Sequence, residues 1–472
     1  MLAPVRGGAR TPSAMPDRPS LRDRLALPLG IYLISAGIYV ATLGPRALPP
    51  SPDNHFVHLA NSLLHGRLDQ GGDPPGTNDW ACYDTELRGP CPNQVFHFEG
   101  ADRERYRWYV SFPPFPAVVV LPFAAAMGTA VPDRLVFALF AGLGPALLYV
   151  LLRALRERGS GRTRRDDLLL TALFAFGSVF FFVAVQGTVW FAAHVVSVPL
   201  LCAFLLASLD ARRPFLAGLF LACLFLTRPT TSLFGIFFVA EALRASRRPS
   251  ATSAGDHATL VHAGADFLRG VDPRAALRRF APFAVPLVAV LVLAAAMNAA
   301  RFDDPFEFGH RYLQIHWRPR IEKWGLFNYL YLSKNLAVFL AALPWLSAQA
   351  PHVVISRHGL ALWFTTPQVL LAAHPKRTTP VFVALALAVV PVAVFDLCYQ
   401  NSGWVQFGYR FALDYLPAVF AMIALSGRRF GAGFVALLVF AIGVNTFGAV
   451  TFDRMFQYYD GDGTQNVIFQ PD

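Results

Sequence analysis

The sequence predicts an all-α polytopic protein that crosses a membrane many times. Hydrophobic residues make up 55% of the 472-residue chain and charged residues only 15%, whereas soluble domains carry roughly 25% charged residues. Apolar stretches of the length that spans a bilayer, about 20 residues, recur along most of the chain. This composition excludes a soluble enzyme, a disordered chain and a fibrous protein.

The positive charge is arranged as membrane proteins arrange it on their cytoplasmic side. The formal net charge is +11, but the basic residues lie in short blocks between apolar segments. The positive-inside rule places such blocks in the cytoplasm, so the charge indicates topology and argues against a nucleic-acid partner. The basic connections are 153–165, 210–213, 244–279, 376–377 and 428–429.

The apolar segments predict roughly 10 to 13 membrane-spanning helices. Residues 27–44 follow an Arg-containing stretch, 1–24, and are expected to form an uncleaved first helix with its N-terminus in the cytoplasm. The later apolar segments are 112–130, 133–152, 168–186, 193–209, 215–227, 230–243, 281–299, 335–349, 359–373, 380–397, 408–425 and 430–449.

Two pairs of short segments predict broken helices, one pair split at 227–229 and the other at 350–358. Broken helices occur at membrane depth only where they are buried in protein or line a water-filled cavity, so both breaks indicate a central cavity. Three apolar segments separate 1–24 from 153–165, whereas two cytoplasmic regions require an even number. Either 112–130 is re-entrant or the charge rule fails at one loop.

We expect three parts in the chain. They are an N-terminal membrane module over 1–243, a cytoplasmic linker over 244–279 and a C-terminal transmembrane module over 280–472. The segments that alternate with the basic loops are rich in His, Trp, Tyr and carboxylate residues and are predicted to lie on the outer face, where any chemistry is expected. These segments are 45–111, 300–334, 398–407 and 450–472.

A short amphipathic helix is predicted at the start of the first outer loop. Its apolar residues recur at i, i+3, i+4 and i+7, Asp53 stands at the N-cap position and Gly66 at the C-terminal end. We expect the helix to lie on the membrane surface. Its apolar face comprises Phe56, Leu59, Ala60, Leu63 and Leu64, and its polar face His55, His58, Ser62 and His65.

Polar residues of this loop have alternative roles. Asp53 is either a helix N-cap or a carboxylate at the mouth of a cavity that takes a proton from a hydroxyl or an amine, and the two roles are compatible. The histidines are weak candidates for metal ligands, and an interfacial polar face is favoured. Cys82 and Cys91 would form a disulfide if the loop faces an oxidising compartment.

Five short motifs follow the first apolar segment. They are Pro-Asp-Asn-His (52–55), Leu-His-Gly-Arg-Leu-Asp (64–69), Tyr-Val-Ser-Phe-Pro-Pro-Phe-Pro (109–116), Leu-Thr-Arg-Pro (226–229) and Gln-Phe-Gly-Tyr-Arg-Phe (406–411) with Asp414. In this order they resemble the motifs of GT-C-type integral membrane glycosyltransferases, the bacterial relatives of protein O-mannosyltransferases and lipid A aminoarabinose transferases. The resemblance covers most of the chain.

The resemblance implies a donor, a base and a GT-C-like fold. Members of this class use polyprenyl-phosphate-linked sugars, and an acidic residue in the first outer loop acts as catalytic base. The matching residue is Asp53. A second acidic residue often follows it, but Asn54 stands there, so Asp69, Asp73 or Asp79 would have to replace it. Members with a lipid monophosphate donor need no metal, so neither a metal nor another cofactor is expected.

Two arginines are candidates for binding the donor phosphate. Arg228 and Arg410 lie at the outer ends of apolar segments, where an unpaired charge is costly, and a planar guanidinium binds two phosphate oxygens at once. The alternative is that they extend to the lipid headgroups. Tyr409, Gln406 and Asp414 surround Arg410, and Asp414, one helical turn on, is its predicted ion-pair partner.

Further candidates for substrate binding lie near the outer face. His194 is expected either to contact substrate or to be buried beside a partner, and His58 is a candidate on the first-loop helix. Asp396 is expected to be structural or to face the headgroups. Trp404, Tyr399 and the cluster His310, Arg311, Tyr312, His316, Trp317 and Arg318 suit a sugar site or an interfacial aromatic belt.

The sequence thus predicts a multi-pass plasma-membrane glycosyltransferase. It would move a sugar from a polyprenyl-phosphate donor to a protein, lipid or glycan acceptor at the outer face. The main alternative is a transporter or flippase of lipid-linked or small polar substrates, which predicts an internal repeat. A scaffold subunit predicts a silent Asp53→Asn substitution, and an O-antigen ligase or polymerase would carry its large outer loop late in the chain, whereas here it comes first.

Overall fold

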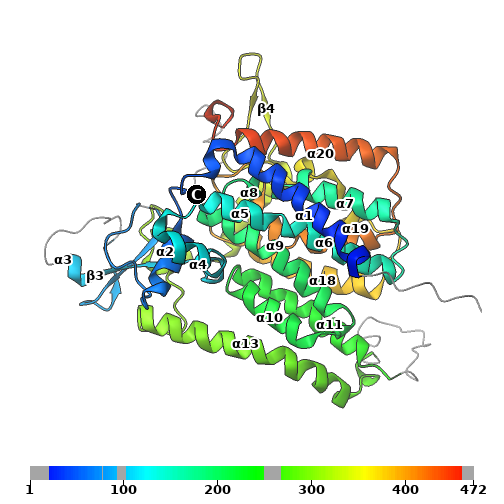
Figure 1. The fold of residues 1–472 in the computed structure, drawn as a ribbon, viewed down its shortest axis with the longest axis horizontal. Helices are drawn as coiled ribbons and strands as arrows, with labels where there is room; N and C mark the ends of the chain where they lie inside the picture. Colours follow the sequence, from blue (N-terminus) through cyan, green and yellow to red (C-terminus); the bar gives the residue numbers. More distant parts are fainter. Residues whose placement is uncertain (1–20, 77, 93–101, 249–266, 460–472) are drawn as a thin grey trace, which may run out of the picture.

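The computed structural model describes residues 21–76, 78–92, 102–248 and 267–459. Within them the chain forms an elongated bundle of helices with a small sheet at one end (Figure 1). Parts of four predicted segments lie outside the described residues. They are 1–20 of the N-terminal stretch, 77 and 93–101 of the first outer loop, 249–266 of the linker and 460–472 of the outer tail.

Six helices are long and apolar enough to cross a membrane, judged by length and composition over the described residues. They are Arg24–Ala47, Asp133–Glu157, Val189–Ala211, Pro273–Phe302, Pro380–Leu397 and Ala432–Thr451. Three shorter apolar helices are Phe115–Ala130, Pro214–Phe225 and Leu416–Leu425. The predicted polytopic helical class is confirmed. Full-length spans are fewer than predicted, because several apolar segments end at a break before reaching the length of a span.

The centre of the bundle is helix α9, which is buried along most of its length and packs against α6 and α10. Its sequence is apolar around the whole circumference, as a central helix requires. Figure 1 places α13 along one edge and α1 and α20 along the opposite one. The bundle helices are α1 (Leu21–Leu43), α5 (Asp133–Ala141), α6 (Leu143–Glu157), α7 (Arg164–Phe176), α8 (Phe180–Ala184), α9 (Val189–Ser208), α10 (Pro214–Phe225), α11 (Gly235–Ala245), α13 (Pro273–Phe302), α18 (Pro380–Leu397), α19 (Leu416–Leu425) and α20 (Ala432–Thr451).

The longest described helix, α13, has clear start and stop signals. The Asp272 side chain accepts a hydrogen bond from the backbone N–H of Arg274 at 2.9 Å, and Pro273 occupies the first helical position, as N-termini favour. The helix ends at Asp303, whose φ of 59° is left-handed. It therefore extends the predicted apolar segment 281–299 on both sides.

Helix α4 (Phe115–Met127) decides between the two predicted topologies. It has 13 residues and is about 20 Å long, which is short against a hydrocarbon core of about 30 Å, and it packs on the first-loop helix. Helices α5 and α6 together form a single candidate span, Asp133–Glu157. Two candidate spans thus separate 1–24 from 153–165, which is the even number that two regions on one side of a membrane require.

The basic loops meet at one end of the bundle. Arg158 and Arg244 both pair with Asp210, at 3.1 and 2.6 Å, and Arg162 donates to the backbone carbonyl of Arg428 at 2.5 Å. These contacts join four of the five predicted basic connections. The prediction that these loops share one face of the membrane is therefore supported by their direct contact.

The other end of the bundle carries a three-stranded antiparallel sheet of order β2–β1–β3. Trp80 pairs with Val110 across β1 and β3, and Cys82 forms a disulfide with Cys91. The sheet is thus tied within the first predicted outer loop. Its elements are β1 (Trp80–Asp84), β2 (Gly89–Pro90) and β3 (Tyr106–Val110), with the short helix α3 (Asp102–Arg105) before β3.

The first-loop helix exists as α2 (His55–Leu64), but its predicted position was wrong. The His55 ring stacks on Trp80 with centroids 4.5 Å apart, and His58 accepts a hydrogen bond from Gln70 at 2.9 Å. The sheet therefore covers the polar face. The apolar residues Phe56, Leu59 and Ala60 are buried in the protein as well, and only the C-terminal end of the helix is exposed. The cap also differs, because Asn54 and not Asp53 occupies the N-cap position.

The second predicted helix break is not a pair of membrane segments. Residues 335–349 and 359–373 form short helices separated by an antiparallel hairpin, and none of them lines the cavity described below. Polar and proline-containing positions between them interrupt the helical pattern. The elements of this region are α14 (Arg318–Trp324), α15 (Leu332–Ala341), β4 (Trp345–Leu346), β5 (Val353–Val354), α16 (Leu362–Thr365) and α17 (Leu370–Ala373).

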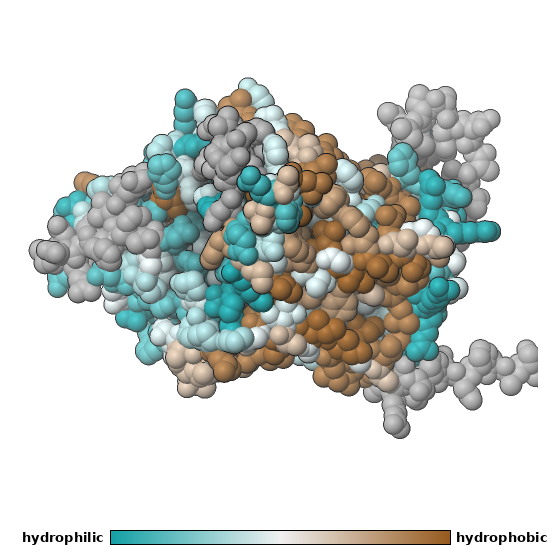
Figure 2. Space-filling model, turned by 90° about the horizontal axis from the view of Figure 1, so that it is seen from above, coloured by the Kyte–Doolittle hydropathy of each residue, from teal (hydrophilic) through white to brown (hydrophobic). Residues whose placement is uncertain are grey.

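The surface has the banding of a membrane protein. Figure 2 shows a hydrophobic belt over the helices, with hydrophilic surface at the sheet end and at the opposite margin. Helix α20 contributes the exposed side chains Leu437, Val439 and Phe440 to the outside of the bundle. Contiguous exposed apolar surface of this kind indicates contact with lipid.

Candidate functional site

A cavity of about 690 Å³ lies at the sheet end of the bundle. It is lined by residues from each of the four predicted outer segments, 45–111, 300–334, 398–407 and 450–472, and by the first helix break. The four segments that the sequence assigns to one face therefore meet at this cavity. Its principal lining residues are 52–53, 78–79, 111–114, 188–191, 225–230, 399–401, 404–405, 410–411 and 452–453, together with Asp396 and parts of 294–317.

The first helix break places Arg228 at the cavity. Helix α10 ends at Phe225, and a short 3-10 helix, η4 (Pro229–Phe234), begins directly after Arg228. Nε and Nη2 of Arg228 donate to Oδ2 of Asp414 at 2.9 and 2.6 Å. Two further donors reach this carboxylate, His194 Nδ1 at 3.0 Å and Thr230 Oγ1 at 3.2 Å.

The predicted pairing of Asp414 with Arg410 was wrong. Both residues belong to a 3-10 helix, η8 (Arg410–Asp414), in which residues four apart do not face each other because one turn takes about three residues. Arg410 instead donates through Nη1 to the backbone carbonyls of Gly403 and Val405. Asp414 lies behind Arg228 and is fully buried.

Arg410 is a buried residue that borders the cavity. Its guanidinium carbon lies 5.1 Å from the centroid of the Phe191 ring, and its backbone N–H donates to Oε1 of Gln406 at 2.9 Å. Gln406 also donates to the carbonyls of Ser402 and His358, at 2.7 and 2.8 Å. Gln406 therefore holds the loop that positions Arg410.

Asp53 lines the cavity just before α2. Its backbone carbonyl accepts a hydrogen bond from Val189 at 3.0 Å, and the preceding turn is fixed by Ser51, which donates to Asp133 through its N–H at 2.7 Å. Burial raises the pKa of Asp53, the Asp453 and Asp133 carboxylates raise it further, and the Arg134 guanidinium opposes them. A carboxylate with a raised pKa is a stronger proton acceptor than an ordinary one.

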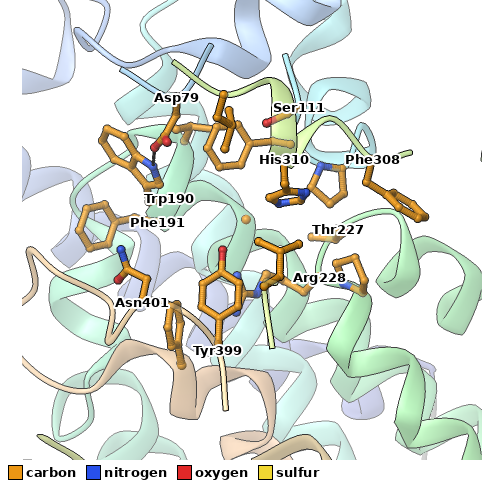
Figure 3. Close-up of a pocket in the computed structure, with 18 of the residues that line it drawn as sticks. Asp79, Ser111, Trp190, Phe191, Thr227, Arg228, Phe308, His310, Tyr399 and Asn401 are labelled. Carbon is orange, nitrogen blue, oxygen red and sulfur yellow. Dashed lines mark hydrogen bonds between the residues drawn. The ribbon is translucent and has the colours of Figure 1, made fainter. Parts of the chain in front are cut away.

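Of the three carboxylates left open by the sequence, Asp79 is the one at this cavity. Its Oδ2 accepts a hydrogen bond from the Trp190 indole at 2.6 Å (Figure 3). Burial raises the pKa of Asp79 to about 6, the Trp190 hydrogen bond opposes this, and the Asp53 charge adds to it. Asp69 lines a separate, more open cleft beside β3.

Several predicted site residues do not reach the cavity. His194 is fully buried and holds Asp414, Tyr409 is buried with its ring 5.3 Å from that of Phe339, and His58 packs edge-on against Trp80. None of the five residues His58, His194, Gln406, Tyr409 and Asp414 lines it. The structure therefore brings together Asp53, Arg228 and Arg410 at the cavity and places the others around or away from them.

Aromatic and imidazole groups form much of the cavity wall. Figure 3 shows Trp190 and Phe191 on one side of the cavity and His310 on the opposite side, with Tyr399 and Arg228 in the lower part of the view. Burial lowers the pKa of His310 to about 4, so its ring is neutral near pH 7. In the predicted cluster only His310 and Trp317 line the cavity. Arg311 and Arg318 instead pair with Glu307 and Glu322.

Two further lining residues, Asp396 and Arg301, were not predicted as functional. Asp396, expected to be structural or to face headgroups, borders the cavity and is only 2% exposed. Arg301 donates to Asn298 at 2.7 Å and to the carbonyl of Val110 at 3.0 Å, which ties α13 to β3. A polar residue at the end of an apolar segment was the only sequence signal for each of them.

The described residues contain no group of three or more His, Cys, Asp or Glu side chains that could hold a metal ion. The Asp79 carboxylate at the cavity accepts a hydrogen bond from Trp190, and Arg228 and Arg410 line the same cavity. Such a set suits hydrogen bonding and charge pairing with an organic anion.

Comparison with known proteins gives distant structural matches. No family model and no curated protein matches the chain. ArnT from Cupriavidus metallidurans, in a crystal structure bound to undecaprenyl phosphate, is 13% identical with a TM-score of 0.47, covering 89% of this chain and 63% of ArnT. The archaeal oligosaccharyltransferase AglB from Archaeoglobus fulgidus, in complex with an inhibitory peptide and a dolichol-phosphate, is 15% identical with a TM-score of 0.42, covering 94% of this chain and 57% of AglB.

AglB is an oligosaccharyltransferase, and the two matched structures hold undecaprenyl phosphate and a dolichol-phosphate, respectively. This chain spans less than two thirds of the length of either protein. The similarity is one of fold at most. Activity, substrates and partners are therefore argued from the residues of this chain.

Proposed function

We propose that this protein is a membrane glycosyltransferase that moves a sugar from a polyprenyl-phosphate donor to an acceptor at the outer face. The observation that carries the proposal is one cavity, at one end of a membrane bundle, bordered by a carboxylate with a raised pKa and by two guanidinium groups. These are Asp53, Arg228 and Arg410. A base and an anion-binding group in one cavity suit transfer from a phosphate leaving group.

The arginines would bind the donor phosphate. Asp414 engages Nε and Nη2 of Arg228, so Nη1 is the nitrogen that a phosphate at the cavity would reach. Arg410, fixed by the carbonyls of Gly403 and Val405, would supply a second positive charge. Cations fixed in advance stabilise the negative charge that develops on the leaving phosphate.

Asp53 would act as the general base. The acceptor hydroxyl or amine attacks the anomeric carbon of the sugar, its proton passes to the Asp53 carboxylate, and the bond between that carbon and the phosphate oxygen breaks. The bonding electron pair leaves with the phosphate. The raised pKa of Asp53 brings its proton affinity closer to that required near neutral pH.

The wall formed by α10 and α13 would receive the prenyl chain. Phe225 and Leu226 at the end of α10, and Ala294 and Met297 of α13, line the cavity. Apolar side chains at this position suit a long hydrocarbon tail that continues into the bilayer.

The cavity would face the outside of a plasma membrane. The basic loops lie at the opposite end of the bundle, where the positive-inside rule puts the cytoplasm, and a disulfide links Cys82 and Cys91 at the cavity end. Disulfides persist in oxidising compartments. The N-terminus would then be cytoplasmic, and no nucleic-acid partner is expected.

The proposal is tested with the purified full chain and the Asp53→Asn variant. With a polyprenyl-phosphate sugar and a mixture of envelope acceptors, we expect the variant to lose about 100-fold or more of its transfer rate while retaining donor binding. Asp69→Asn removes the same charge from the same loop outside the cavity and should leave the rate unchanged. An Asp53→Asn protein that is correctly inserted and fully active would falsify the assignment of the base. A transporter would translocate lipid without transferring sugar.

A further inference from the structure

A second carboxylate at the cavity has no part in the proposed transfer step. Asp79 lines the cavity and is 9% exposed. It directly precedes β1, the central strand of the sheet, so its backbone is anchored. Its φ of 59° lies in the left-handed region, which Asp and Asn tolerate better than longer side chains do. The carboxylate is therefore held in a defined place.

The two oxygens of this carboxylate differ. Oδ2 accepts the Trp190 indole N–H at 2.6 Å, and Trp190 is itself fixed at the start of α9. Among the described residues, no hydrogen bond is donated to Oδ1. Oδ1 is not one of the fully buried polar atoms that lack a partner, so this oxygen of a cavity-lining residue is accessible and can accept a hydrogen bond from a ligand.

Asp79 and Arg228, one of the two arginines that would bind phosphate, lie on different sides of the cavity. Figure 3 shows Asp79 and Trp190 together at one side and Arg228 and Tyr399 at the other. A ligand that spans the space would present an anion to Arg228 and a hydrogen-bond donor to Asp79. A sugar linked to a phosphate has this polarity, because its hydroxyl groups lie away from the phosphate.

We propose that Asp79 binds a hydroxyl group of the transferred sugar through Oδ1, and that Trp190 orients the carboxylate for this contact. The inference rests on the proposed function and adds to it a residue that discriminates between sugars. Hydroxyl groups bound by a buried charged acceptor are strong specificity determinants, because an analogue without that hydroxyl leaves the acceptor unpaired.

The Asp79→Asn variant isolates this contact. The asparagine Oδ1 retains an acceptor for the Trp190 indole, and asparagine tolerates the left-handed backbone. What changes is the group facing the ligand, which becomes an amide and loses the negative charge. Loss of a hydrogen bond to a charged group corresponds to about a 10-fold to 100-fold loss of affinity.

The experiment is a binding titration of the full chain in lipid nanodiscs. The probes are undecaprenyl phosphate and undecaprenyl phosphate linked to glucose, galactose, mannose or arabinose. The unsubstituted protein should bind at least one sugar-linked lipid more tightly than the bare lipid phosphate. Asp79→Asn should lose about 10-fold or more of the affinity for that lipid and keep its affinity for undecaprenyl phosphate. Asp69→Asn should change neither the affinity for the sugar-linked lipid nor the affinity for undecaprenyl phosphate.

Each other outcome has a distinct meaning. If Asp79→Asn keeps the sugar-dependent affinity, or weakens both classes of lipid equally, the inference is overturned, since Asp79 then has at most a structural role. If no sugar increases the affinity of the unsubstituted protein over that of bare lipid phosphate, the inference also fails, while lipid-phosphate binding stands. If the unsubstituted protein binds none of the lipids, the proposed function itself fails.

A second variant guards against a folding defect. Trp190→Phe keeps the carboxylate and removes only the indole donor to Oδ2. We expect it to reduce sugar-dependent affinity less than Asp79→Asn does, and to leave the affinity for undecaprenyl phosphate unchanged. Melting temperatures of both variants, measured in the same nanodiscs, identify any loss of fold.

Discussion

Arg228 and Asp414 form a bidentate ion pair between two distant parts of the chain. Nε and Nη2 of Arg228 reach Oδ2 of Asp414 at 2.9 and 2.6 Å, and Nε reaches Oδ1 at 3.0 Å. Asp414 is fully buried, whereas Arg228 also borders the cavity. The pair thus connects the cavity to the core and fixes the orientation of the proposed phosphate ligand.

Breaking this pair from one side should destabilise the protein strongly. Asp414→Asn leaves the Arg228 charge without its counter-charge, which typically costs about 3–5 kcal/mol for a buried pair. Arg228→Met combined with Asp414→Leu should cost less than the sum of the single changes. Denaturation in detergent measures the free energy of unfolding of the two single variants and of the double variant. The exposed Arg212, 3.4 Å from Asp210, is the control, because Arg212→Met should change stability by less than about 1 kcal/mol.

Arg410 should matter for ligand binding through its geometry as well as its charge. Its Nη1 donates to the carbonyls of Gly403 and Val405, and lysine cannot reproduce a planar fork. We expect Arg410→Lys to weaken binding of undecaprenyl phosphate about 10-fold, as measured by titration in nanodiscs. Arg212→Lys, in the basic loops at the other end, should bind like the unsubstituted protein. Equal affinities for all three proteins would contradict the role of Arg410.

Sugar-dependent binding should fall with acidification. The pKa of Asp79 is raised to about 6 by burial; the Trp190 hydrogen bond and the Arg410 charge oppose the rise, and the Asp53 charge adds to it. Tyr399 is also within electrostatic range. Below this pKa Asp79 is protonated and accepts a hydroxyl less strongly. Affinity for the sugar-linked lipid should therefore decline from pH 7 to pH 5, and this decline should be absent in Asp79→Asn.

The same carboxylate should lower stability at high pH. The folded-state pKa of Asp79, about 6, exceeds its ordinary value of 3.8, so the folded state binds the proton more tightly than the unfolded state. The stability contributed by the proton on Asp79 is fully present below the ordinary pKa. It is lost as the pH rises through the folded-state pKa. Asp79→Asn should therefore be more stable than the unsubstituted protein at pH 8, by up to about 3 kcal/mol. The melting temperatures of both proteins at pH 5 and pH 8 test the direction of this difference in stability.

The Cys82–Cys91 disulfide should stabilise the sheet and report its compartment. The bond closes a loop with a sequence separation of nine, and its removal by Cys82→Ser with Cys91→Ser should cost about 2–4 kcal/mol, measured by thermal denaturation. In intact cells, both cysteines should resist alkylation until a reductant is added. Rapid alkylation without reductant would place this loop on the reducing side and contradict the proposed orientation.

Gly218 should be needed for the contact between α10 and α13. A Cβ at this position would clash with the backbone carbonyl oxygen of Phe283, so Gly218→Ala must push the two helices apart. We expect a loss of about 1–3 kcal/mol and weaker donor binding, because both helices line the cavity. Gly30→Ala is the control, since no described heavy atom lies within 4 Å of its added Cβ.

The general arrangement of the helices and their connections could be predicted because it depends on local properties. Hydropathy marks the apolar helices, and blocks of arginine mark the loops that the structure joins around Asp210. The helix break at 227–229 also predicted correctly that Arg228 borders a cavity. The hydropathy of each segment is nearly independent of its partners, so one sequence is enough to see it.

Contacts between distant segments could not be predicted in this way. Asp414 was assigned to Arg410, its neighbour in sequence, but pairs with Arg228, because η8 has 3-10 geometry. The polar face of α2 was assigned to the membrane surface, but His55 stacks on Trp80 of a sheet that the hydropathy pattern did not reveal. In both cases the decisive partner lies elsewhere in the chain.

The sequence by itself determined that this is a membrane protein, which end of it is basic, and that Asp53, Arg228 and Arg410 belong to segments at the other end. Only the tertiary structure decided that Asp79 joins them, that Asp414 supports Arg228, and that α4 is too short for a full span. The physical reason is that partition into lipid follows from the composition of each segment. Hydrogen bonds and ion pairs instead depend on distances between atoms, which only the folded chain fixes.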